Sequence, residues 1–359
     1  MADIDKQRTI RPWLVVLSIF VFVGAIYSGF WLVLAMSSRE QVVKWIREQS
    51  VHGLTVHYDE LVASGYPFAI RLVLANPRLN VSNTVLPWDW QGANLKVTIQ
   101  LWDRNSFRIK ASGQQVLVFG KDKRVQKYTG NMKQALGRFV LSEGKIKKVR
   151  INLLGVQLTK YDPGTATIKI PRAELSLNRL KKNQGDYLAG SWGLSGSTED
   201  LTLPWFEGSP LGDKLGLNFN ARLIGNIKNG QLIKSLESWR DHGGTIELEK
   251  LKIEHGPLKI HTEGTLALDG KLQPIGALTA QLKGFYETID ALKKLGVVKA
   301  RNAITAKMFM GVLSRTPTGG GPPVLNLAIT AQNQNLYVGP VRLLQLPEVN
   351  WHQGLNPFL

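Results

Sequence analysis

The chain begins with one long apolar segment and then changes to strand-like alternation. The run from Trp13 to Met36 holds 24 residues without a charge. As a helix it would extend about 36 Å at ~1.5 Å per residue, enough to cross a hydrocarbon core of ~30 Å with some tilt. It is longer than the apolar part of a cleaved secretory signal, and the residues that end it match a cleavage site poorly. The pattern therefore predicts an uncleaved membrane anchor rather than a signal peptide or a buried core helix.

After the anchor the hydrophobic period changes. Residues 37–50 keep a helical spacing and predict a juxtamembrane helix, and from there the period stays near two for most of the chain. The clearest alternating stretches are 68–74, 95–101, 149–153, 175–177, 215–223, 258–268 and 272–282. Asp269-Gly270 separates two of these runs, which indicates a hairpin with a tight type I′ turn. Helical spacing returns at 286–314, with shorter candidates at 131–140 and 232–241.

One apolar face per strand is typical of antiparallel sheets. We therefore expect a mainly β fold, in which an N-terminal transmembrane helix precedes a large antiparallel, curved β-sheet with a few packed helices. Such a sheet forms either a sandwich with a filled core or an open half-barrel with an apolar groove, and the sequence leaves both open. The expected organisation is a cytoplasmic tail (1–12), an anchor (13–36), a juxtamembrane helix (37–50) and an extracytoplasmic domain (51–359), as one unit or two lobes.

The charges beside the anchor do not fix its orientation, because three basic residues precede it and three follow within 11 residues. A short tail precedes the anchor and more than 300 residues follow it, and long domains are translocated largely regardless of charge. We therefore expect a single-pass inner-membrane protein with a cytoplasmic N-terminus and its bulk in the periplasm. The absence of cysteine excludes a disulfide framework and a thiolate metal site.

The net charge of +18 is concentrated in one quarter of the chain. Residues 96–182 carry 20 Lys and Arg against 5 Asp and Glu. A candidate surface for anionic head groups consists of Lys121, Lys123, Arg124, Lys127, Lys145, Lys147, Lys148 and Arg150. Ordinary solvent-facing strand positions would explain the exposure of these residues but not their common sign. The expected partners are the inner membrane, anionic lipid or lipopolysaccharide, or an acidic envelope protein. Nucleic acid is not expected, since no motif that binds it is present.

No motif for catalysis, for a cofactor or for a metal ion is recognisable. The chain lacks a G-x-S-x-G elbow, a G-x-G-x-x-G loop and a P-loop, and its six histidines show no ligand spacing. We therefore expect no enzyme, no cofactor and no metal site. Carboxylates that only the fold brings together would leave no trace in the sequence, so a hydrolase is a third alternative.

One combination of turn residues is unusual. Gly65-Tyr66-Pro67-Phe68, followed by alternating apolar residues and Asn76-Pro77-Arg78-Leu79, resembles a segment of a membrane-anchored domain-of-unknown-function family of alphaproteobacteria. Residues 256–284, which include Asp269 and Gly270, and the tail from Gly339-Pro340 to Leu346-Pro347 resemble two further segments of that family. The similarity covers most of the chain and is looser over 120–250. We interpret the glycines, prolines and Asp269 of these motifs as residues that set turns and bulges.

The resemblance implies no activity. In outline the family is similar to AsmA-like envelope proteins, which combine an inner-membrane anchor with a β-rich periplasmic part linked to lipid handling. The preferred hypothesis is a membrane-anchored periplasmic protein that binds or transfers envelope lipid in an apolar groove. The alternative is a structural or interaction subunit of an envelope complex that docks an acidic partner through the basic face. A hollow apolar interior would favour the first of these.

Overall fold

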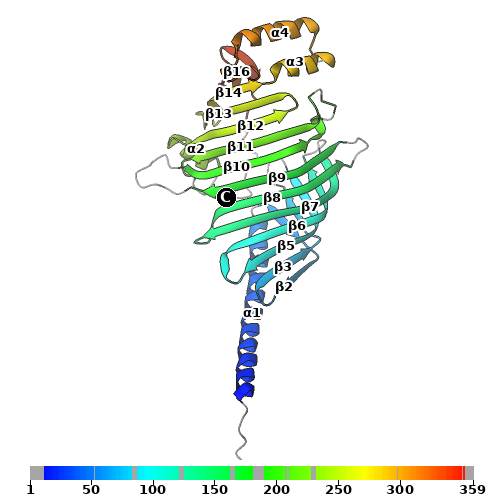
Figure 1. Cartoon of the computed structure of the whole chain (residues 1–359). Helices are drawn as coiled ribbons and strands as arrows, with labels where there is room; N and C mark the ends of the chain where they lie inside the picture. The colour runs from blue at the N-terminus through cyan, green and yellow to red at the C-terminus, as the bar shows by residue number, and fades with distance from the viewer. Residues whose placement is uncertain are drawn as a thin grey trace, which may run out of the picture.

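The computed structural model consists of one long N-terminal helix and one large β-sheet (Figure 1). It describes residues 12–51, 53–82, 87–120, 125–161, 166–180, 190–206, 208–209, 211–227, 232–296, 298–349 and 351. The helices are α1 (Pro12–Val51), α2 (Leu232–Asp241), α3 (Phe285–Lys294) and α4 (Ala300–Leu313), with a 3-10 helix at Pro204–Phe206. The strands are β1 (Leu54–His57), β2 (Glu60–Ser64), β3 (Ala69–Ala75), β4 (Arg78–Val81), β5 (Trp88–Gln100), β6 (Asp103–Phe119), β7 (Gln126–Ser142), β8 (Lys145–Lys160), β9 (Thr167–Arg179), β10 (Gly190–Thr202), β11 (Lys214–Ile224), β12 (Thr245–His255), β13 (Leu258–Leu268), β14 (Pro274–Lys283), β15 (Ser314–Arg315), β16 (Val324–Gln332), β17 (Asn335–Val338) and β18 (Val341–Gln345).

The eighteen described strands form a single antiparallel sheet that is built as a meander. From β5 onward, strands adjacent in sequence pair with each other, except that β14 pairs with β16. At the edge next to α1, β4 pairs with the first half of β5 and β3 pairs with its second half. β1 then pairs with β4, and β2 pairs with β3. The strands stack one above another in the direction of the α1 axis, away from its free end (Figure 1). The predicted fold class is confirmed, and the sheet has the open form rather than a sandwich.

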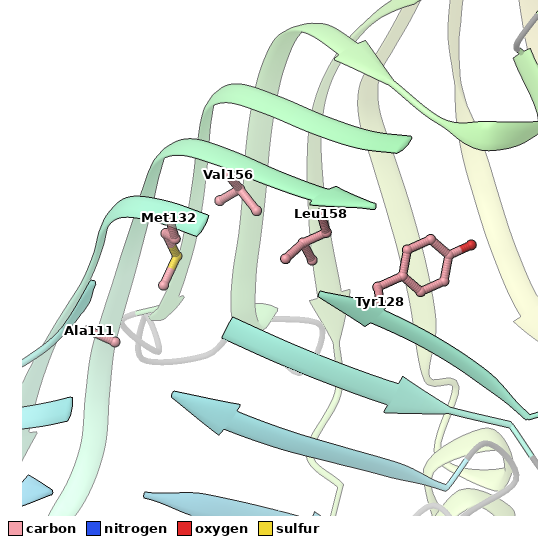
Figure 2. Packing of buried hydrophobic residues seen from close by; sticks show 5 residues of the cluster. All are labelled: Ala111, Tyr128, Met132, Val156 and Leu158. Atoms are coloured by element: carbon pink, nitrogen blue, oxygen red, sulfur yellow. The ribbon is translucent and has the colours of Figure 1, made fainter. Parts of the chain in front are cut away.

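Irregularities near the middle of the long strands bend the sheet. Register shifts occur at Gly92/Asn94 in β5, Ala111/Gly113 in β6, Asn220/Ala221 in β11 and Leu248/Leu251 in β12. In β8, Gly155 has a left-handed φ of +59°, and it lies opposite Pro171 of β9, which has no N–H to donate. Bulges increase the local bend and twist of a strand. The irregularities of β5, β6 and β8 lie at a similar level in neighbouring strands, and the sheet curls into a gutter there, whose arching strands are seen in Figure 2.

Two apolar clusters hold the sheet in this shape. The first lies where the second half of α1 packs on the sheet, and it buries Leu61, Ile70, Leu72 and Leu74 against Leu34, Val42 and Val43 of the helix. The second lies on the inner side of the bend, beneath the arching strands, and contains Ala111, Tyr128, Met132, Val156 and Leu158 (Figure 2). Both clusters lie towards the α1 end of the sheet. Among the later strands, Ala280 of β14 and Leu325 of β16 are also fully buried or nearly so.

Most of the predicted elements are confirmed, with two corrections. Helices are present at 232–241 and within 286–314, as α2, α3 and α4. The helix predicted at 131–140 is wrong, because this segment lies within β7. A hairpin does join β13 and β14, but its turn spans 269–273 rather than two residues. The wider turn forms because Asp269 Oδ1 accepts hydrogen bonds from the backbone N–H groups of Lys271 and Gln273, each at 2.8 Å.

The anchor and the juxtamembrane helix predicted after it are one continuous helix. α1 runs from Pro12 to Val51 without interruption, although its first half is exposed and its second half packs on the sheet. The sheet already contacts the helix at Tyr27 and Trp31, within the apolar run, whereas the charged residues of α1 appear only after Met36. This change of composition inside one helix explains why the sequence suggested two segments.

Candidate functional site

Three cross-strand rows of uncharged residues line the inner face of the gutter. The central row contains Leu72, Val97, Ile109, Gly137, Ile151, Leu175, Gly196, Phe219, Leu251, Thr262, Ala280 and Leu327. The flanking rows run from Ile70 to Ile329 and from Leu74 to Leu325, again without a charged residue. At ~4.8 Å per strand these rows extend about 50 Å across the sheet. Strand alternation and antiparallel register together therefore produce a continuous apolar track.

This track is covered at one end and open in the middle. Near the anchor, Ile70, Leu72 and Leu74 are buried beneath α1. Further along, Leu175 and Leu194 remain 40% and 37% exposed although their side chains lie on the inner face. Exposed apolar side chains on the concave side of an open sheet form a groove rather than a packed core. The inner face of the gutter is therefore open to solvent at β9 and β10.

The wall near the bend contains two buried polar side chains. Burial raises the pKa of the Tyr128 phenol, which stays neutral and donates a hydrogen bond to Gln126 Oε1 at 3.1 Å. Gln115 donates from its amide nitrogen to the Gly113 carbonyl, while its amide oxygen has no hydrogen-bond partner. Neither group carries a charge, so Tyr128 and Gln115 place neutral hydrogen-bonding groups beside the apolar track.

The Gly-aromatic-Pro-Phe motif forms the turn by which the sheet binds α1. Tyr27 donates to the Pro67 carbonyl at 2.6 Å, and Trp31 Nε1 donates to the Ala69 carbonyl at 3.0 Å. Tyr66 hydrogen-bonds Ser28 through the two hydroxyls at 2.8 Å, and its ring lies edge-on to Trp31. Gly65 has a φ of +104°, and a Cβ there would lie 2.6 Å from the Ala69 carbonyl oxygen, so a larger residue does not fit this turn.

The second motif fixes the break between β3 and β4. Asn76 adopts a left-handed φ of 46° and donates to Asp59 Oδ2 at 2.7 Å, and Pro77, which follows it, is fully buried. Arg78 then pairs with Asp89 of β5 at 2.8 Å. Pro77 therefore occupies a backbone-shaping position, as do Gly65, Pro67 and Asp269, while Gly270 lies in the turn without a left-handed φ. Phe68 stands apart, since its side chain is exposed.

The predicted basic surface is divided between the two ends of the long strands. Lys121, Lys123 and Arg124 lie outside the described residues. Lys127 is at the beginning of β7, with its Nζ 4.4 Å from the centre of the Tyr161 ring. Lys145, Lys147, Lys148 and Arg150 are exposed together at the beginning of β8. Lys148 of β8 lies opposite Val140 of β7. Val140 follows Lys127 by thirteen residues along β7, so Lys127 and Lys148 are about 40 Å apart at ~3.3 Å per residue. Of these residues, the structure brings only the last four together.

A basic row that the sequence analysis did not single out crosses the outer face. Arg108, Arg138 and Arg150 lie directly opposite one another on β6, β7 and β8, and all three are exposed. None of them forms an ion pair with a described carboxylate. The sequence shows that each arginine lies on the polar face of its own strand. That the three are neighbours follows only from how the strands pair.

The outer face also has a hollow of about 520 Å³ across β12, β13, β14 and β16. Glu247, Glu249 and Glu263 lie along it, and Arg222 forms ion pairs with the first two at 2.7 and 2.8 Å. Among the residues that the structure describes, no three His, Asp or Glu side chains are grouped as metal ligands. Arg222 thus bridges two of the three glutamates on this part of the sheet surface.

The comparisons with known proteins give family membership and nothing more specific. No curated protein and no solved structure matches the chain. Of the described helices, α1 alone is long and apolar enough to cross a membrane. The predicted membership of an uncharacterized family is confirmed. The similarity to AsmA-like architecture and the alphaproteobacterial origin stay predictions. Residues 31–347 match a family described as an uncharacterized protein conserved in bacteria, and the chain therefore belongs to this family, DUF2125.

Proposed function

We propose that this chain is a non-enzymatic, single-pass protein of the bacterial inner membrane that binds envelope lipid in its gutter. The observation that carries the proposal is the track of three uncharged rows, in which Leu175 and Leu194 of the neighbouring strands β9 and β10 are partly exposed. Apolar surface in contact with water costs about 25 cal/mol per Å², and large exposed apolar patches mark binding sites. Acyl chains relieve this cost without directional contacts, since hydrophobic attraction depends on area alone.

The length of the track favours transfer over storage of a single lipid. Acyl chains of one leaflet extend about 15 Å, half of a ~30 Å hydrocarbon core, whereas the track extends about 50 Å. More than one lipid therefore fits end to end, or one lipid can move along it. A cytoplasmic N-terminus would place the sheet in the periplasm, and similarity in outline to AsmA-like proteins supports the same role by analogy.

Photo-crosslinking at adjacent positions of one strand tests this proposal. A photoreactive amino acid at Leu194 would face the gutter, while the same residue at Ser195 would face outward, because successive side chains alternate. We expect lipid adducts, identified by mass spectrometry after irradiation of cells, at position 194 and none at 195. Equal labelling of the two positions, or no lipid at either, would contradict lipid binding in the gutter.

The basic row supports a second candidate function, docking of an acidic partner in an envelope complex. Like charges directly opposite one another destabilise a sheet, and Arg108, Arg138 and Arg150 form two such pairs in succession. Their repulsion is relieved when an anionic surface binds across them. The two functions use opposite faces of the sheet, so each can be tested without the other.

Exchanging the central arginine for glutamine is expected to stabilise the isolated protein. Arg138→Gln removes both like-charge contacts, and each is worth about 0.2–1 kcal/mol. The free energy of unfolding, measured by denaturant titration, should rise by about 0.4–2 kcal/mol. In cells the same variant should lose crosslinks to an acidic protein partner. Crosslinks that persist unchanged in Arg138→Gln would show that this row is not the docking surface.

A further inference from the structure

The part of α1 that binds the sheet overlaps the part that has to cross the membrane. Arg11 precedes the helix, so the hydrocarbon-embedded segment begins no earlier than about Trp13. A core of ~30 Å requires about 20 residues at ~1.5 Å each, which places the far boundary near Leu32. Yet the sheet already hydrogen-bonds the helix at Tyr27 and Trp31. The contacts therefore lie at the depth of the membrane boundary, not above it.

The free part of the helix is too short to avoid this overlap. Only the stretch from Trp13 to Ile26 precedes the first contact, and it extends about 21 Å. This is about 9 Å less than the hydrocarbon core. Tilting the helix lengthens the path that it must cover and so brings the sheet still deeper.

Two neighbouring turns of the sheet lie at this level. The first is Gly65–Phe68, which contacts α1, and the second is Leu101–Trp102, which joins β5 to β6. The turns are adjacent, because the backbone N–H of Leu101 donates to the Phe68 carbonyl at 3.5 Å. Figure 1 shows the β5–β6 hairpin at the lower edge of the sheet, beside α1.

Both turns expose large aromatic side chains. Phe68 and Trp102 are each 68% exposed, and Tyr66 between them and the helix is 53% exposed. Aromatic side chains of this kind are favoured at the boundary between hydrocarbon and water, where amphipathic rings contact both phases. An isolated exposed Phe needs no explanation, but here the exposed rings cluster at the depth that the helix length independently assigns to the interface.

We infer that the Gly65–Phe68 and Leu101–Trp102 turns insert into the interfacial layer of the membrane that α1 crosses, and form a second membrane contact with lipid as the partner. The inference rests on α1 as the anchor and does not require lipid in the gutter. It deepens the proposed function, because it places the covered end of the apolar track at the bilayer surface. A lipid leaving the bilayer would then reach the track without crossing water.

The absence of cysteine allows a depth measurement at single sites in the full chain. Phe68→Cys and Trp102→Cys, each labelled with a polarity-sensitive nitrobenzoxadiazole, are compared with Val341→Cys. Val341 is similarly exposed but lies on β18, at the far edge of the sheet. The full chain is reconstituted in vesicles of phosphatidylethanolamine and phosphatidylglycerol that contain spin-labelled lipid. We expect several-fold stronger quenching, with a blue-shifted emission, at positions 68 and 102 than at 341.

Emission and quenching at 68 and 102 that equal those at 341 would overturn the inference. So would release of the full chain from vesicles by alkaline carbonate, because α1 would then not be an integral span. Lipid adducts inside the gutter do not enter this measurement. Failure of the crosslinking experiment at Leu194 together with strong quenching at 68 and 102 would therefore reject the lipid gutter and retain the membrane contact.

Discussion

Replacing Leu72 by alanine is expected to lower the free energy of unfolding by about 2–5 kcal/mol. Leu72 is fully buried at the base of the central row, where Ile70 and Leu74 flank it and α1 covers it. Truncation removes apolar contacts from both the sheet and the helix and leaves a cavity that a helix fixed by neighbouring contacts cannot fill. Denaturant titration of the full chain in detergent, followed by tryptophan fluorescence, measures the loss.

Leu154→Ala provides the matched control. This leucine lies in β8 and is 45% exposed, so the same truncation should cost less than about 1 kcal/mol. If both variants lost the same stability, the docking of α1 on the first strands would not be a stabilising core. A loss confined to Leu72→Ala would show that Leu72 belongs to a stabilising core between α1 and the first strands.

The two faces of the sheet could be predicted because alternation alone determines them. Leu217 and Phe219 share a phase in the sequence, and both lie in the rows that line the gutter. The open form could not be predicted, since alternation states that one face is apolar but not what covers it. That outcome depends on bends at residues such as Gly155 and on strand register, which connects positions far apart in the chain.

The mistaken helix at 131–140 has a specific physical cause. Met132 and Ala135 both face the inside of the gutter, although they are three positions apart, because β7 and β6 change register between Ala111 and Gly113. A bulge that reverses the phase of a strand therefore produces the three- and four-residue spacings of a helix. The segment nevertheless forms a strand, because β7 pairs with β6 on one side and with β8 on the other.

The candidate basic surface shows the same limit. Lys127 and Lys148 are close in sequence, but antiparallel strands of this length carry them to opposite ends of the sheet. Conversely, Arg108 and Arg138 are 30 residues apart, further than Lys127 and Lys148, and yet they are directly paired. Charge bias along a chain predicts that a protein has a basic region, whereas only the register of the ladders determines its shape.

Replacing Leu175 and Leu194 together by aspartate is expected to reduce lipid binding at least tenfold, which corresponds to about 1.4 kcal/mol. These residues lie on adjacent strands of the open part of the track, and both are partly exposed, so the empty protein tolerates the charges. Bound acyl chains would have to desolvate two unpaired carboxylates and would lose contacts worth about 1.5–3 kcal/mol for each buried leucine. Quantitative mass spectrometry of lipids that co-purify with the full chain measures the change.

The matched control places the same two charges on the outer face of the same strands. Ser176 and Ser195 are cross-strand partners there, and Arg150 lies opposite Ser176 to offset the added charge. Ser176→Asp with Ser195→Asp should therefore retain lipid at the level of the unmodified protein, while the inner-face variant loses it. Equal loss in both variants would trace the effect to folding or net charge, and equal retention would show that acyl chains do not occupy the gutter. A difference between the faces is the result that an internal lipid track explains, since the two variants carry the same number of added charges on the same two strands.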